Sequence, residues 1–80
     1  MNPTTLANYL KDLGTLLRED AYAAKKARDN AGDESARQFE GGRLMAYNEV
    51  ISTMQSQAIA FGLTHDEVGL GGIQTDRDLT

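Results

Sequence analysis

Apolar residues recur at helical spacing along two long stretches of this 80-residue chain. Steps of three and four positions put side chains on one face of an α-helix, whereas a half-buried strand alternates with a period of two. The only proline, Pro3, stands where a helix can begin, so it interrupts neither stretch. The sequence therefore predicts an all-α fold. Its apolar positions are Leu6, Tyr9, Leu10, Leu13, Leu16, Leu17, Ala21, Ala24, Ala27 and Ala31, then Ala36, Phe39, Tyr47, Val50, Ile51, Met54, Ala58 and Phe61.

Two helices are predicted, from about residue 4 to 31 and from about residue 35 to 61. Asn2 is a suitable N-cap for the first helix, and Gly32 can take the left-handed position that follows its end. A tight turn at Gly32 and Asp33 would make the helices antiparallel. We therefore predict that residues 1–63 form a helical hairpin.

The second helix has two candidate N-caps. Asp33 is one, and Ser35 is the other because Gln38 three residues later completes a capping box. The sequence between the helices does not decide between Asp33 and Ser35 as the N-cap.

Residues 64–80 are expected to add little regular structure. Thr64 and Glu67 fit a further capping box, but several glycines follow closely, so we predict only a short helical turn. We predict a flexible acidic tail after it. The alternative is a tail that lies over the hairpin, anchored by Leu70, Ile73 and Leu79.

One charged residue interrupts each apolar stripe. Asp20 stands on the first stripe and Arg43 on the second. In an antiparallel hairpin, residues at the same level have numbers that add up to about 65, given equal rise per residue. This places Asp20 and Arg43 within one turn of each other and predicts an ion pair that fixes the helix register. The alternative is that both side chains lean to the edge of the stripe and stay solvated.

Gly41 and Gly42 directly precede Arg43, although glycine costs a helix interior about 1 kcal/mol relative to alanine. In the predicted register they face Ala24 and its neighbour Ala23, so small residues would let the two backbones approach closely. We therefore predict a continuous helix through the two glycines. The alternative is a break, with a short segment before it.

A two-helix hairpin buries too little surface to be stable alone in most chains of this length. Apolar residues also lie outside the main stripe of the second helix, at Leu44, Met45 and Ile59. We therefore expect a homodimer that forms a four-helix bundle.

The sequence offers little for catalysis. There is no cysteine, and the only histidine, His65, stands in a capping box, where exposure is expected. Neither His65 with its acidic neighbours nor the run Asp76-Arg77-Asp78 has the spacing of a specific metal site. We therefore expect no enzyme activity, no cofactor and no metal.

The charge and hydropathy restrict the partners. The formal net charge of −4 disfavours sequence-independent DNA binding, which relies on a basic surface. No stretch approaches the ~18 apolar residues of a membrane span, and the first residues lack the pattern of a signal peptide. We expect a cytoplasmic protein without a membrane partner.

A basic cluster near the hairpin tip is the main candidate for a polar contact surface. It comprises Lys25, Lys26, Arg28 and Arg37, with Tyr22 nearby and off the apolar stripe. Acidic residues interleave with it, which favours a solvated face with local ion pairs. A nucleic-acid-binding regulator is the alternative that this cluster leaves open.

Residues 42–50 carry a Gly-Arg-x-x-Ala-Tyr-x-Glu-Val core, and residues 57–62 a Gln-Ala-x-x-Phe-Gly segment. Together with the acidic ending at Asp76, Asp78 and Leu79, these resemble a group of small uncharacterised proteins carried by phages and integrative elements of proteobacteria. The resemblance implies a mobile-element origin and no known activity.

These observations favour a non-enzymatic protein-interaction module, such as an accessory or host-modulating protein of a mobile element. The alternatives are the nucleic-acid-associated regulator and an inhibitor of a host defence or transcription complex.

Overall fold

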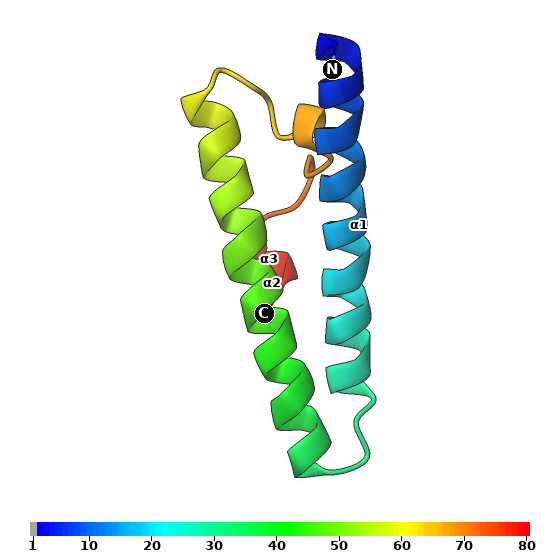
Figure 1. The fold of residues 1–80 in the computed structure, drawn as a ribbon. Coiled ribbons are helices and arrows are strands. Elements are labelled where there is room, and N and C mark those ends of the chain that lie inside the picture. The colour runs from blue at the N-terminus through cyan, green and yellow to red at the C-terminus, as the bar shows by residue number, and fades with distance from the viewer. Residues whose placement is uncertain (1) are drawn as a thin grey trace.

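The computed structural model describes residues 2–80, and within this range helices are the only regular secondary structure. Helix α1 spans Pro3–Asp29 and helix α2 spans Glu34–Ala60, and the two pack as an antiparallel hairpin (Figure 1). A short 3-10 helix, η1, spans Asp66–Val68, and a single turn, α3, spans Thr75–Asp78. The predicted all-α hairpin is confirmed, and α2 continues through Gly41 and Gly42 without a break.

Side-chain caps fix the starts of both long helices. The Asn2 carboxamide oxygen accepts a hydrogen bond from the Thr5 N–H at 2.8 Å, as expected for an N-cap. The Asp33 carboxylate does the same for the Ala36 N–H at 2.7 Å. Asp33 is therefore the cap of α2, and Ser35 lies inside the helix.

The end of α1 differs from the prediction. The helix ends at Asp29, and Asn30 closes it by donating its N–H to the Lys26 carbonyl at 3.0 Å. Gly32 does not have a positive φ angle. The connection of residues 30–33 therefore reverses the chain without a left-handed residue. The prediction of a glycine C-cap at this position was wrong.

The end of α2 does have a glycine C-cap. Gly62 adopts φ +77° and donates its N–H to Ile59 at 3.0 Å, while the Leu63 N–H bonds to the Ala58 carbonyl at 2.8 Å. This pair of bonds is the Schellman motif, which turns the chain back towards the hairpin. Thr64 and Glu67 then exchange the two hydrogen bonds of the predicted capping box, at 2.9 and 3.2 Å.

Residues 63–80, the C-terminal segment, lie along one long face of the hairpin (Figure 1). Leu70, Ile73 and Leu79 are buried there together with Val68. The prediction of a flexible tail is therefore corrected to its alternative, a segment packed on the hairpin. The apolar residues of this segment are few and lie between glycines, so they show no helical periodicity from which the packing could be predicted. All four of these apolar residues nevertheless reach the core.

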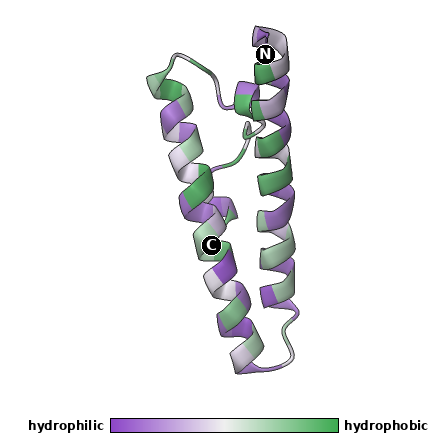
Figure 2. Ribbon diagram, in the orientation of Figure 1, coloured by the Kyte–Doolittle hydropathy of each residue, from purple (hydrophilic) through white to green (hydrophobic). Residues whose placement is uncertain are grey.

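The buried face of α2 is rotated from the predicted one. Its buried residues are Leu44, Ile51, Gln55 and Ala58, whereas Phe39, Val50 and Phe61 are exposed. The C-terminal segment covers Leu44 and Gln55, so α2 carries buried apolar residues on one side and exposed ones on another. In Figure 2, hydrophobic (green) and hydrophilic (purple) residues alternate along α2. Among residues 2–80, no helix is both long and apolar enough to cross a membrane.

Candidate interaction surface

Polar side chains of α2 hold the C-terminal segment in place. The buried Gln55 carboxamide donates to the carbonyl oxygens of Leu70 and Ile73, at 3.2 and 3.0 Å. Seven residues earlier, Asn48 donates to the carbonyls of Thr75 and Leu79, at 3.0 and 3.1 Å. Gln55 and Asn48 thereby supply donors to the Leu70, Ile73 and Leu79 carbonyls, which no backbone N–H of the described residues reaches. The Thr75 carbonyl also accepts the Leu79 N–H at 3.0 Å.

Basic side chains of α1 complete this attachment from the other helix. Arg18 donates to the Gly71 carbonyl, Lys25 to the Asp78 carbonyl at 2.8 Å, and Arg28 to the Thr80 carbonyl at 3.2 Å. The sequence predicts Lys25 and Arg28 on a possible partner surface. The carbonyls that they contact instead belong to the same chain, more than fifty residues away, and Arg28 also bonds to the adjacent Asp29 carboxylate at 3.0 Å.

The other members of the basic cluster stay at the surface. Arg37 pairs with Glu34 one turn away at 3.1 Å, and Lys26 and Tyr22 are exposed. These positions do not join Lys25 and Arg28 into one basic face. The predicted cluster is therefore divided between attachment of the C-terminal segment and a local ion pair.

The Asp78 carboxylate closes the last turn of the chain. It accepts hydrogen bonds from the Arg77 guanidinium at 2.7 Å and from the Gln74 N–H at 3.0 Å. These donors, the guanidinium foremost, hold the pKa of Asp78 well below its usual range.

The close approach of backbones occurs at Gly14 and Gly69, between α1 and η1. A Cβ atom on Gly14 would overlap the Val68 carbonyl, and one on Gly69 would overlap the Lys11 carbonyl. By contrast, a Cβ atom on Gly42 would meet nothing within 4 Å, and one on Gly41 only the Arg28 side chain at 3.7 Å. The predicted close contact of Gly41 and Gly42 with Ala24 is therefore wrong, although Ala24 itself is fully buried.

Asp20 and Arg43 do not form the predicted intrachain pair. Arg43 instead bonds to Glu40 at 2.6 Å, one turn earlier on the same helix, and this carboxylate raises the pKa of the guanidinium. Asp20 is exposed and has no ion-pair partner within residues 2–80. Each residue directly precedes a buried one, so at about 100° per residue both side chains turn out of the helix–helix seam.

Three exposed apolar residues of α2 follow one line. Phe39, Val50 and Phe61 succeed one another at intervals of eleven residues, about three turns, so they share a face of the helix. Their exposed fractions are 66, 45 and 79%. Val50 lies two residues from Asn48, about 200° around the helix, so this line faces away from the C-terminal segment.

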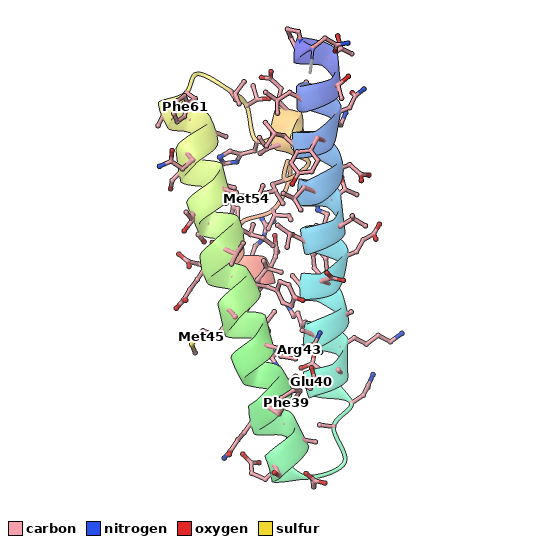
Figure 3. The ribbon with its side chains drawn as sticks, viewed as in Figure 1. Phe39, Glu40, Arg43, Met45, Met54 and Phe61 are labelled. Atoms are coloured by element: carbon pink, nitrogen blue, oxygen red, sulfur yellow. The ribbon has the colours of Figure 1, made fainter. Side chains whose placement is uncertain are left out.

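α1 supplies a matching line. Tyr9 and Leu16 are exposed, and each stands two residues before a position that contacts the C-terminal segment, Lys11 or Arg18. They therefore face away from it as well. We call the surface formed by these lines the open face; it comprises Leu6, Tyr9 and Leu16 of α1 and Phe39, Val50 and Phe61 of α2. In Figure 3, Phe61, Met54, Arg43 and Phe39 follow one another along α2, while Met45 projects from its outer edge.

An apolar cavity of about 330 Å³ adjoins the open face at the end where the helices separate. Its wall includes Leu10 of α1, Met54 and Phe61 of α2, and Leu63 and Val68 of the C-terminal segment. Gln57 is the one polar residue in the lining. The open face thus meets an apolar cavity at one of its ends, where the two share Phe61.

Within residues 2–80, no group of three or more histidine or acidic side chains is placed to hold a metal ion. Comparison with protein-family models, with curated proteins and with solved structures gives no match for this chain. The apolar residues of the open face remain exposed to solvent in the folded chain.

Proposed function

We propose that this chain is a protein-interaction module that docks a helical partner on its open face. The observation that carries the proposal is the separation of the hairpin into two sides. The C-terminal segment covers one side, and the other keeps Tyr9, Phe39 and Phe61 in solvent. Aromatic residues gathered on one face are typical of interfaces, because they combine large apolar area with little conformational freedom.

The use of aromatic residues supports this proposal. The chain has five, and four of them, Tyr9, Tyr22, Phe39 and Phe61, are exposed. A chain of this length has a thin core and would gain stability by burying them. Three of the four lie on the open face. The resemblance to proteins of phages and integrative elements fits an accessory role of this kind.

The nucleic-acid alternative has less support. Two of its four basic residues, Lys25 and Arg28, are occupied by carbonyl groups of the C-terminal segment, and Arg37 faces Glu34. Nucleic-acid binding needs several cations free to meet phosphates. The other alternative, an inhibitor of a host defence or transcription complex, is compatible with docking on the open face, because such an inhibitor would bind its target through this surface.

A photo-crosslinking experiment tests the docking function. A photoreactive phenylalanine replaces Val50 on the open face, and a second variant carries it at Met45, which is more exposed but lies at the outer edge of α2. We expect irradiation of cells that produce the chain to give discrete covalent adducts from position 50 and not from position 45. Mass spectrometry of the adducts identifies the partner.

Either a second copy or another protein in the adduct supports docking on the open face. Equal labelling at the two positions, or no adduct at position 50, would contradict the proposal.

A further inference from the structure

We infer that the occupant of the open face is a second copy of this chain, related by a two-fold axis parallel to the helices. In that arrangement α1 of one protomer packs against α2 of its partner, and Asp20 meets Arg43 across the interface. This inference rests on the docking function proposed for the open face and names its partner.

The helix ends place Asp20 and Arg43 at one level of the hairpin. Asp20 stands nine positions before Asp29, the last residue of α1, and Arg43 stands nine positions after Glu34, the first residue of α2. A two-fold axis parallel to the helices keeps every residue at its level and exchanges the sides of the hairpin. It therefore places α1 opposite the partner's α2, and Asp20 opposite the Arg43 position.

The two charges are suited to this contact. Asp20 is exposed and lies eleven residues after Tyr9, so it belongs to the same face of α1. The Arg43 side chain lies between Phe39 and Val50 on α2 and retains 40% of its exposure. Its contact with Glu40 uses one guanidinium nitrogen, Nη1, and Tyr47 also lies beside the group, but the five N–H donors of a guanidinium still leave some for a second carboxylate. Such a pair between protomers would fix the register of the dimer.

The apolar residues match in the same register. Leu13 and Val50 both lie sixteen positions from their helix ends at the turn, and Tyr9 and Met54 both lie twenty. Across the two-fold axis, Val50 therefore meets the partner's α1 near residue 13, and Met54 meets it near residue 9. The Tyr9 side chain would then enter the apolar cavity beside Met54 and Phe61.

The size and topology of the open face are adequate for a stable dimer. The molecule measures 47 by 21 Å across its two longer dimensions. This gives a projected area of about 1,000 Å², compared with about 800 Å² per partner in a standard interface.

Every neighbouring pair of helices in the bundle is antiparallel, which suits the helix dipoles. Both C-terminal segments stay on the outside. A two-fold axis across the helices would instead place α1 against α1 and separate the opposite charges.

Exchange of the charges between chains provides the test. Asp20→Arg and Arg43→Asp are made in separate full-length chains, and sedimentation measures dimerisation of each and of an equimolar mixture. Each variant alone places like charges in both contacts, so we expect its dimer to weaken by about tenfold or more. In the mixed dimer both contacts again join opposite charges. We therefore expect the mixture to recover the dimer, and native mass spectrometry to identify it as the mixed species.

Glu19→Arg is the matched control, because it makes the same charge change on an exposed residue about 100° around α1. We expect it to leave dimerisation unchanged. A monomeric parent chain at 100 µM, or a mixture as weak as the separate variants, would overturn the inference. The docking function would survive that result if position 50 still gave adducts with another protein.

A cysteine experiment keeps the test decisive if a charge variant fails to fold. The chain contains no cysteine, so Asp20→Cys and Arg43→Cys chains each carry a single thiol. We expect rapid disulfide formation between the two variants when they are mixed, and little within either alone, because α1 and the partner's α1 lie diagonally in the bundle. Equal rates in the three samples would exclude the proposed axis.

Discussion

At the scale of single residues, the glycines of this chain divide by what surrounds them. Gly14 lies inside α1 where the Val68 carbonyl meets the helix backbone, whereas Gly42 lies inside α2 with open space around it. Both have the same helical cost relative to alanine. The two glycines therefore differ only in their tertiary contacts, and the sequence alone does not distinguish them.

Gly14→Ala is expected to lower the free energy of unfolding by about 1 to 3 kcal/mol, the usual cost of overpacking, because its methyl group must displace η1. Gly42→Ala is expected to raise that free energy by about 1 kcal/mol through helix propensity. Urea unfolding followed by circular dichroism measures both. A stabilising Gly14→Ala would show that α1 and η1 are not in contact in solution.

The Asp78 carboxylate gives the folded state a pH dependence. Its pKa is lower in the folded chain than the ~3.9 of an unfolded aspartate, so it stabilises the fold above about pH 4 and loses this effect as the pH falls towards the folded pKa. Asp78→Asn should therefore be less stable than the parent chain at pH 7, and the difference should shrink at pH 3 and below. Thermal unfolding across this range, with Asp76→Asn as the exposed control, measures it. A difference that stays constant with pH would contradict the assignment.

At the scale of elements, the C-terminal segment depends on side chains that lie far away in the sequence. It contains only one helical turn and one 3-10 turn, and its carbonyl groups rely on Gln55, Asn48 and basic residues of α1. Its place on the hairpin thus depends on tertiary hydrogen bonds as well as on four buried aliphatic residues, Val68, Leu70, Ile73 and Leu79.

Gln55→Ala is expected to lower the free energy of unfolding by about 1 to 3 kcal/mol, because the Leu70 and Ile73 carbonyls would stay buried without a donor. Amide hydrogen exchange should rise first in residues 70–79. Gln57→Ala, on an exposed residue of the same helix, serves as the control. Equal exchange in the two variants would mean that Gln55 does not hold the segment.

At the scale of the whole molecule, the chain uses its apolar residues on two sides. One side forms the core with the C-terminal segment, and the other is the open face. A small hairpin covered on one side has limited apolar burial of its own. The proposed dimer would bury the second side and leave the two C-terminal segments outside. The crosslinking and charge-exchange experiments above distinguish a dimer from a complex with another protein.

Local sequence signals were sufficient to predict the helices. Periodicity and Asn2 predicted both long helices to within two residues of their observed ends, and Thr64 with Glu67 predicted the turn after them. Each of these signals acts over a few neighbouring residues, so it can be recognised without knowing the fold. The continuity of α2 through Gly41 and Gly42 was also predicted correctly, but from a close contact with α1 that the structure does not contain.

Tertiary structure alone decided which faces are used. The sequence predicts a main apolar stripe on α2 that includes Phe39 and Val50 and excludes Leu44. Contact with the C-terminal segment instead brings Leu44 into the core and leaves Phe39 and Val50 exposed. In the same way, the turn of each helix decides that Asp20 and Arg43 point out of the seam instead of towards each other. Local signals fix where a helix lies in the chain, but its rotation depends on contacts between residues far apart in the sequence.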